Sequence, residues 1–177
     1  MIETERLILR PWREADREGL FRLNNDPRVG AWLAGPLDRA GNDALMARLA
    51  AHQADHGFSF WTAERRSDGA VVGMIGLAVV KAGDLPVGPA VEIGWRLVPA
   101  VWGDGYATEG AQAALDWGFA NLDVDEIIAF TARTNLASQA VMRRIGMTPD
   151  PARDFDHPRL AVNHPLRAHV VFAAERP

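Results

Sequence analysis

Short runs of apolar residues, several of them alternating with polar residues, predict β-strands along the chain. Strands are expected at 6–10, 58–64, 71–80, 91–98, 126–132 and 169–174. Ser67-Asp68-Gly69 lies between the second and third of these and is a hairpin turn signal. Three strands in succession from residue 58 onward indicate an antiparallel meander.

Helical spacing of apolar residues appears in other parts of the chain. Helices are expected at 14–24, 42–56, 107–119 and 136–145. Asp26-Pro27 ends the first helix, and Gly57 is suited to the C-cap of the second. Strands and helices are mixed along the chain without internal repeats, so the pattern predicts an α+β fold. The segment 149–165, rich in Pro, Asp and His, is expected to be a surface loop, because few residues follow it.

Composition narrows the function classes. The 177 residues suit a single domain, 1–177. The chain contains no cysteine, which excludes disulfides, a thiolate nucleophile and cysteine-ligated zinc. It has no leader-like N-terminus and no apolar run long enough to span a bilayer, so a cytoplasmic protein without membrane partners is expected. A net charge of −4 argues against nucleic acid as a ligand and favours a cationic partner such as an amine.

The segment 102–108, Trp-Gly-Asp-Gly-Tyr-Ala-Thr, carries the chemistry that the sequence reveals most clearly. Gly103 and Gly105 allow a sharp turn that can bring successive backbone N–H groups toward a ligand. A helix is expected to begin immediately afterwards, and its first N–H groups attract anions, so a pyrophosphate would find donors there. Thr108 can add a hydroxyl. The alternative is an ordinary strand-to-helix connection that uses glycine for its backbone angles.

Two other nucleotide motifs do not fit this segment. The dinucleotide fingerprint Gly-x-Gly-x-x-Gly/Ala would require Gly or Ala where Thr108 stands, and the preceding strands read as antiparallel. An ATPase phosphate loop requires Gly-Lys-Ser/Thr, which is absent.

Three stretches together resemble the GNAT acetyltransferases, and within them the branch typified by the RimJ and RimL N-terminal acetyltransferases. They are 3–10 at the start, 93–109 in the middle, and 134–138 with 144–147. The family's acetyl-CoA motif Gln/Arg-x-x-Gly-x-Gly/Ala aligns with 102–107, where Trp102 takes the first place. The resemblance covers nearly the whole chain and is more specific for the fold than for the substrate.

The resemblance implies a GNAT fold, with a mixed, mostly antiparallel and splayed sheet flanked by helices on both faces. The pantetheine arm of acetyl-CoA would lie between the strands that end near Val98 and Ala132. Backbone groups of Leu97 and Val98 would pair with it, and a nearby N–H would stabilise the acetyl oxygen. The implied cofactor-binding residues are Leu97, Val98, Gly103, Asp104, Gly105, Tyr106, Ala107, Thr108 and Asn135.

For catalysis, the resemblance points to Glu92 and Ser138. Glu92 would be the base that removes the proton of the amine, directly or through a water. The alternative for Glu92 is a structural carboxylate that caps a sheet edge or pairs with a nearby arginine. The family often has a tyrosine that protonates the departing thiolate, but Val141-Met142 occupy that place here. The resemblance to the RimL-like branch assigns this role of acid to Ser138 instead. A thiol of pKa about 8.5 also leaves tolerably as its anion, so no acid is strictly required.

Asn135 has two interpretations that stay open at this point. The pattern Asn-x-x-Ser predicts a helix N-cap, in which the Asn135 side chain accepts from the backbone N–H of Ser138. The resemblance instead implies a contact with the cofactor arm.

The acceptor site is implied to lie along residues 25–37, with Trp32 as substrate-binding residue, and along the loop that holds residues 155–158. Trp32 is alternatively a core residue. His157, His164 and His169 lack the spacing of metal ligands, so no metal is expected.

The sequence thus favours an acetyl-CoA-dependent N-acetyltransferase that acts on a primary amine, either a small molecule or a peptide N-terminus. The alternative is a non-catalytic acyl-CoA binding module, supported by the missing tyrosine. An exposed C-terminal strand would allow a homodimer to form.

Overall fold

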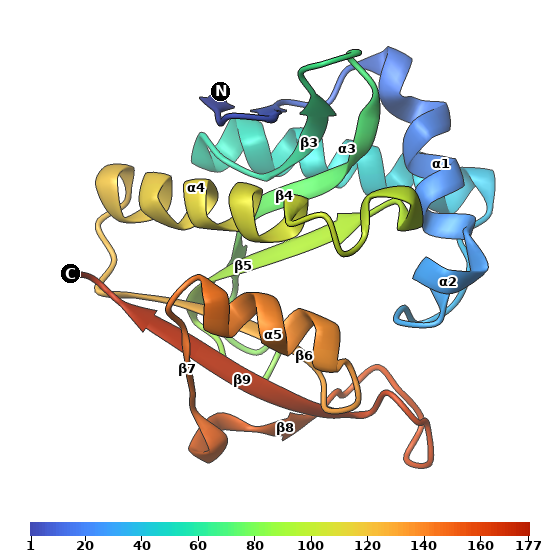
Figure 1. Ribbon diagram of the computed structural model, residues 1–177. Helices are drawn as coiled ribbons and strands as arrows, with labels where there is room; N and C mark the ends of the chain where they lie inside the picture. Colours follow the sequence, from blue (N-terminus) through green and yellow to red (C-terminus); the bar gives the residue numbers. More distant parts are fainter.

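A nine-stranded mixed sheet forms the centre of the protein in a computed structural model that describes residues 1–177 (Figure 1). The strands follow one another across the sheet in the order β1-β2-β3-β4-β5-β6-β9-β7, and β8 also pairs with β9. Their bounds are β1 Ile2–Glu3, β2 Leu7–Arg10, β3 Phe60–Arg65, β4 Val71–Val80, β5 Ala90–Leu97, β6 Glu126–Ala132, β7 Thr148–Pro149, β8 Phe155–Asp156 and β9 Ala168–Glu175. Every pairing is antiparallel except that of β5 with β6.

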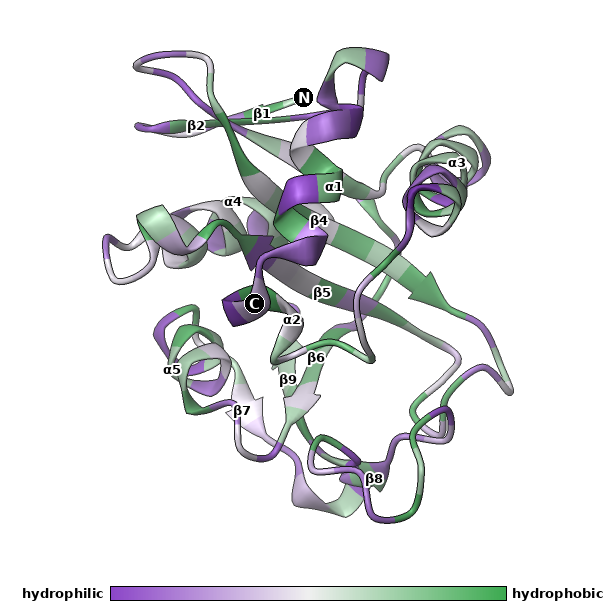
Figure 2. Ribbon diagram, turned by 90° about the vertical axis from the view of Figure 1, so that its right-hand side faces the viewer, coloured by the Kyte–Doolittle hydropathy of each residue, from purple (hydrophilic) through white to green (hydrophobic).

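Helices cover both faces of this sheet. They are α1 Arg17–Asn25, α2 Pro27–Gly30, α3 Arg39–His56, α4 Tyr106–Asn121 and α5 Leu136–Arg144, with short 3₁₀ turns at Glu14–Asp16, Pro99–Val101 and Pro151–Arg153. Figure 2 shows α4 and α5 on one side of the sheet and α3 on the other, with predominantly hydrophobic residues along β4 between them. Each side has its own apolar cluster, because alternate residues of a strand face opposite ways: Ile75 of β4 packs under α4, and Met74 packs against α1 and α3.

All six strands and all four helices expected from the sequence are present, and the meander is β3-β4-β5. Gly57 adopts the left-handed conformation expected of a C-cap. The short elements β1, α2, β7 and β8 were not expected, because two to four residues are too few for a periodic pattern.

Residues 149–165 lie at the surface as expected, since none of them is buried. They are not entirely loop, because Pro149 belongs to β7, Phe155–Asp156 form β8, and both strands pair with β9. The C-terminal strand β9 is also not an exposed edge: it pairs with β6 on one side and with β7 and β8 on the other. It therefore offers no free edge for a second copy of the chain.

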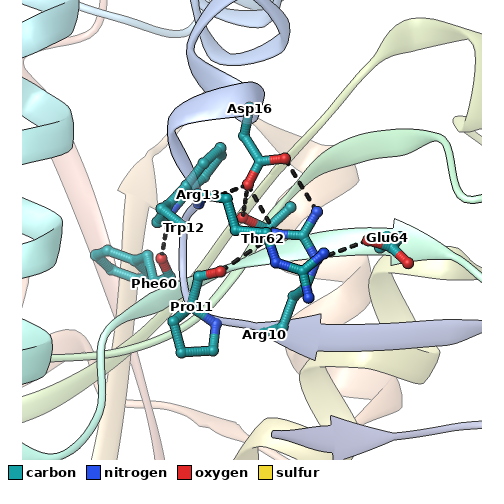
Figure 3. Close-up of polar contacts among 8 residues, drawn as sticks. All are labelled: Arg10, Pro11, Trp12, Arg13, Asp16, Phe60, Thr62 and Glu64. Atoms are coloured by element: carbon teal, nitrogen blue, oxygen red, sulfur yellow. Dashed lines mark hydrogen bonds and ion pairs between the residues drawn. The ribbon is translucent and has the colours of Figure 1, made fainter.

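The first helix is attached to the sheet by a buried ion-pair network (Figure 3). Arg10 of β2 donates two hydrogen bonds to the carboxylate of Asp16, at 2.7 and 2.9 Å, and a third to Glu64 of β3 at 2.6 Å. Asp16 also accepts from the N–H of Arg13 and the hydroxyl of Thr62. The side chains of Arg10 and Asp16 are each 5% exposed, so this network fixes the start of α1 against β2 and β3.

None of the helices combines the length and the apolar character that a membrane span requires.

Candidate active site

The sheet opens between β5 and β6. These two strands are parallel and have a single register pair, Glu92 with Ile128, after which they separate. Figure 1 shows the gap widening, with α4 above it and α5 below it. A cleft of about 970 Å³ occupies the opening. It is lined by β5 from Ile93 to Leu97, by the turn before α4 and the first turn of that helix, by Phe130 and Thr131 of β6, by α5 from Ala137 to Arg144, and by Val29, Trp32 and Leu33.

Backbone groups of β5 face this gap without a partner strand. The N–H of Val98 donates to the carbonyl of Val72 at 2.8 Å. Backbone groups alternate in direction along a strand, so Arg96 and Gly94 also direct their N–H and C=O groups toward β4. Trp95 and Leu97 therefore direct their N–H and C=O groups toward β6, where the strands have already parted. The carbonyl of Leu97 accepts from the indole N–H of Trp102 at 2.8 Å. The N–H and C=O of Trp95 and the N–H of Leu97 remain open to the gap.

The turn before α4 presents a row of free donors. Gly103 and Gly105 both have φ of +86°, a left-handed conformation that strongly favours glycine. The backbone N–H groups from Gly103 to Thr108 have no acceptor within the protein, because the first helical bond is made by Glu109 to the carbonyl of Gly105. The turn therefore directs several N–H groups and the positive end of the α4 dipole toward one place, which suits a diphosphate.

An ion pair across the chain holds this turn in position. Arg6 donates to Glu109 at 2.6 Å and to the carbonyl of Asp104 at 2.8 Å, and its guanidinium lies 4.3 Å from the centre of the Tyr106 ring. Glu109 also accepts from the hydroxyl of Thr4 and the N–H of Arg6. Burial alone would raise the pKa of Glu109, but these hydrogen bonds hold that pKa below its ordinary value. This ion pair connects the N-terminal stretch around Arg6 with the first turn of α4, a contact that could not be predicted from the sequence.

The structure brings most of the sequence-predicted residues to the cleft. Those that line it are Trp32, Leu97, Gly103, Gly105, Ala107, Thr108, Asn135 and Ser138. Asp104 and Tyr106 do not line it, although their backbone N–H groups belong to the donor row. Val98 does not line it either, and its N–H is already bound to Val72, so its assignment as a backbone partner is wrong. The open backbone groups belong to Trp95 and Leu97, an alternation that only the strand register reveals.

The side chain of Asn135 accepts a hydrogen bond from the N–H of Ser138 at 3.2 Å and caps α5. The N-cap interpretation is therefore confirmed, and Asn135 also lines the cleft. The side chain of Ser138 makes no hydrogen bond within the protein and lines the cleft one turn into the helix. Trp32 is 40% exposed, so its alternative as a core residue is wrong.

Glu92 lies at the point where the strands part, but one position before the segment of β5 that lines the cleft. Its carboxylate forms neither a hydrogen bond nor an ion pair, so the alternative in which it pairs with a nearby arginine is wrong. Burial raises the pKa of Glu92 to about 7. A carboxyl group with such a pKa exchanges protons near neutral pH, which is the property required of a general base.

No group of three or more His, Asp or Glu side chains lies together in a way that could hold a metal ion. His157 and His169 do lie side by side, with ring centres 5.1 Å apart, next to the ring of Phe155.

Comparison with known proteins places the chain in a family. Residues 6–148 match the model of the acetyltransferase (GNAT) domain. The chain belongs to the GNAT acetyltransferase family. It is 32% identical over 145 residues to the uncharacterized protein YkkB of Bacillus subtilis, covering 81% of this chain and 83% of YkkB.

A second relative of this GNAT chain has a named activity. The FsC-acetyl coenzyme A-N(2)-transacetylase of Aspergillus fumigatus is 31% identical over 153 residues, which are 83% of this chain and 64% of that longer enzyme. The solved structure of Mycobacterium smegmatis RimJ in complex with CoA-disulfide has the same fold, with a TM-score of 0.74 at 23% identity, covering 97% of this chain and 86% of RimJ. The expected GNAT fold and the RimJ/RimL-like branch are thus confirmed.

Proposed function

We propose that this GNAT acetyltransferase moves an acetyl group from acetyl-CoA directly to a primary amine. The row of free N–H groups from Gly103 to Thr108 at the head of the cleft carries the proposal. It would bind the diphosphate of the cofactor. The pantetheine arm would follow the open edge of β5 at Trp95 and Leu97, and Asn135 would contact it from α5.

In the proposed reaction, the nitrogen of the neutral amine attacks the carbonyl carbon of the thioester. One of the free N–H groups on β5 would stabilise the oxygen that becomes negative. Glu92 would take up the proton of the amine, through a water because its side chain lies beside the cleft and not in it. The C–S bond then breaks, and the CoA thiolate leaves as the anion or takes a proton from Ser138.

Relatives support the cofactor and leave the choice of amine open. RimJ of M. smegmatis was solved with a CoA-disulfide, and the A. fumigatus relative is named as an acetyl coenzyme A transacetylase. Other structures with this fold include a spermidine N-acetyltransferase and a ribosomal L7/L12 N-terminal acetyltransferase. The acceptor proposed for this chain is accordingly a small amine or a peptide N-terminus.

Release of free thiol from acetyl-CoA, measured with a panel of small amines and peptides, tests this function. Turnover with at least one amine is expected, accompanied by an acetylated product in the mass spectrum. Binding of CoA without turnover on any member of a broad panel would instead favour a non-catalytic acyl-CoA binding module.

Gly105→Ala is expected to weaken the binding of CoA about tenfold. Alanine at φ +86° costs about 1–2 kcal/mol, and its Cβ would stand 3.3 Å from the guanidinium of Arg6, so the turn relaxes and its N–H groups lose their common direction. Isothermal titration with CoA measures the effect. Pantetheine, which lacks the diphosphate, should bind the variant and the natural protein equally.

Gly69→Ala is the matched control for this prediction. Gly69 also has a positive φ, +69°, with open space around it, but it lies in the turn between β3 and β4. It should lower thermal stability by a similar amount and leave CoA affinity unchanged. An equal loss of CoA affinity in both variants would show that the turn before α4 has no specific role.

A further inference from the structure

The proposed acetyl transfer leaves two charged side chains of the cleft without a role: Arg144, which is exposed at the end of α5, and Arg96 of β5. Arg96 of β5 lines the cleft and lies in the strand two residues after Gly94 and four after Glu92, so the three share one face of the sheet. That face is the one covered by α1 and α2, opposite to α4 and its N–H row. Arg96 therefore lies on the side of the cleft where Val29, Trp32 and Leu33 form the other wall.

The charge of Arg96 is not neutralised within the protein. Arg96 belongs to no ion pair, and its one hydrogen bond goes to the side-chain oxygen of Asn24 on α1. The other two guanidinium nitrogens of Arg96 make no hydrogen bond within the protein. Every fully buried side-chain nitrogen has a hydrogen-bond partner, so these two nitrogens are accessible to solvent, and Arg96 lines the cleft. Glu109, the carboxylate that lines the cleft, is paired with Arg6, and Glu92 of the same strand as Arg96 forms no ion pair.

Buried neutral amides fix Arg96 in this position. Asn24, fully buried, accepts from Arg96 and donates to the side-chain oxygen of Asn42 at 3.3 Å. Asn42 donates in turn to the carbonyl of Arg17 at 3.3 Å. An aspartate at position 24 would have the same shape and would cancel the charge. The chain instead orients the guanidinium with amides and leaves its positive charge for another partner.

From this arrangement we infer that the acceptor is a primary amine that carries a carboxylate in the same molecule, and that Arg96 binds this carboxylate. The inference rests on the proposed acetyl transfer and names its substrate class. A guanidinium offers a planar pair of donors that matches a carboxylate, and partial removal from water strengthens such a bond. Burial lowers the pKa of Arg96 to about 10, so it stays charged at neutral pH. A polyamine would place a second cation against Arg96 and is disfavoured.

Matched pairs of amines test the inference. Phenylalanine with phenethylamine, ornithine with putrescine, and β-alanine with ethylamine differ by the carboxylate and vary its distance from the amine. The natural protein is expected to prefer the carboxylate member of at least one pair by about ten- to a hundredfold in kcat/KM. Arg96→Met should abolish the preference, mainly by raising KM for the member that carries the carboxylate. Arg96→Lys should restore part of it.

Two further variants separate binding from folding. Arg28→Met removes an exposed arginine of α2 that pairs with Asp26, and it should leave the preference intact. Asn24→Asp places a carboxylate beside Arg96 and should lower the preference even if Arg96→Met does not fold. Thermal melting verifies that each variant is folded.

A binding measurement separates this inference from the proposed function. N-acetylated amino acids, titrated into the CoA complex, should bind more tightly than the corresponding N-acetylated amines, and Arg96→Met should remove the difference. If amines are acetylated without any preference for a carboxylate, or if the preference survives in Arg96→Met, the inference is wrong and the acetyl transfer stands. If no amine is acetylated but the Arg96-dependent binding is observed, the proposed reaction is wrong and the carboxylate site stands.

Discussion

Glu92→Gln is expected to lower kcat by about 10²- to 10⁴-fold, the usual contribution of a positioned general base. Glutamine keeps the shape of the side chain and cannot accept the proton of the amine. Because burial raises the pKa of Glu92 to about 7, the natural enzyme should gain activity as the pH rises through this value. The variant should lose that rise. Steady-state rates between pH 5.5 and 9 at saturating acetyl-CoA measure both effects.

Glu92→Gln should also change how the thermal stability of the protein depends on pH. A carboxyl group whose pKa is raised on folding loses stabilisation as the pH rises from its unfolded value of about 4.5 to its folded value of about 7. Glu92→Gln should therefore melt at a higher temperature than the natural protein at pH 8, and the difference should vanish near pH 4. A loss of activity with this gain in stability excludes misfolding as the cause.

Glu126→Gln is the matched control for Glu92→Gln. Glu126 begins the neighbouring strand β6, and its carboxylate pairs with Arg153 away from the cleft. Its substitution should leave kcat and the pH profile unchanged. A Glu92→Gln enzyme with natural kcat and an unchanged rise near pH 7 would contradict the assigned role.

Asp16→Ala is expected to lower the free energy of unfolding by about 3–5 kcal/mol, because it leaves the buried guanidinium of Arg10 with Glu64 as its one carboxylate partner. For a chain of this size the melting temperature should fall by roughly 10 °C. Glu14→Ala, in the same 3₁₀ turn, removes an exposed ion pair with Arg17 and should change the free energy of unfolding much less. Chemical denaturation of the two variants measures the contrast.

The Asp16 network also predicts a pH dependence. Burial alone would raise the pKa of Asp16, but the hydrogen bonds from Arg10, Arg13 and Thr62 outweigh it and hold this pKa below its ordinary value. Its stabilisation is therefore complete above about pH 4 and is lost as the pH falls through the folded pKa. The gap in stability between natural protein and Asp16→Ala should narrow in acid. A gap that does not narrow at any acidic pH at which the protein still folds would show that Asp16 acts without its charge.

The sequence by itself determined the fold class, the long strands and helices, and the glycine turn whose N–H groups stay free before α4. These follow from local physics: side-chain period, turn residues, and the two glycines whose backbone angles a side chain would oppose. The N-cap role of Asn135 was readable for the same reason, since donor and acceptor lie three residues apart.

Only the tertiary structure decided which groups meet across the chain. The ion pair of Arg6 with Glu109 joins residues 103 positions apart, and the hydrogen bond of Arg96 to Asn24 joins residues 72 positions apart. The register of β5 showed that Trp95, and not Val98, exposes its backbone to the gap, because a shift by one residue reverses every backbone group along the strand. The raised pKa of Glu92 likewise depends on burial, which the packing of the sheet against its helices creates and no local pattern records.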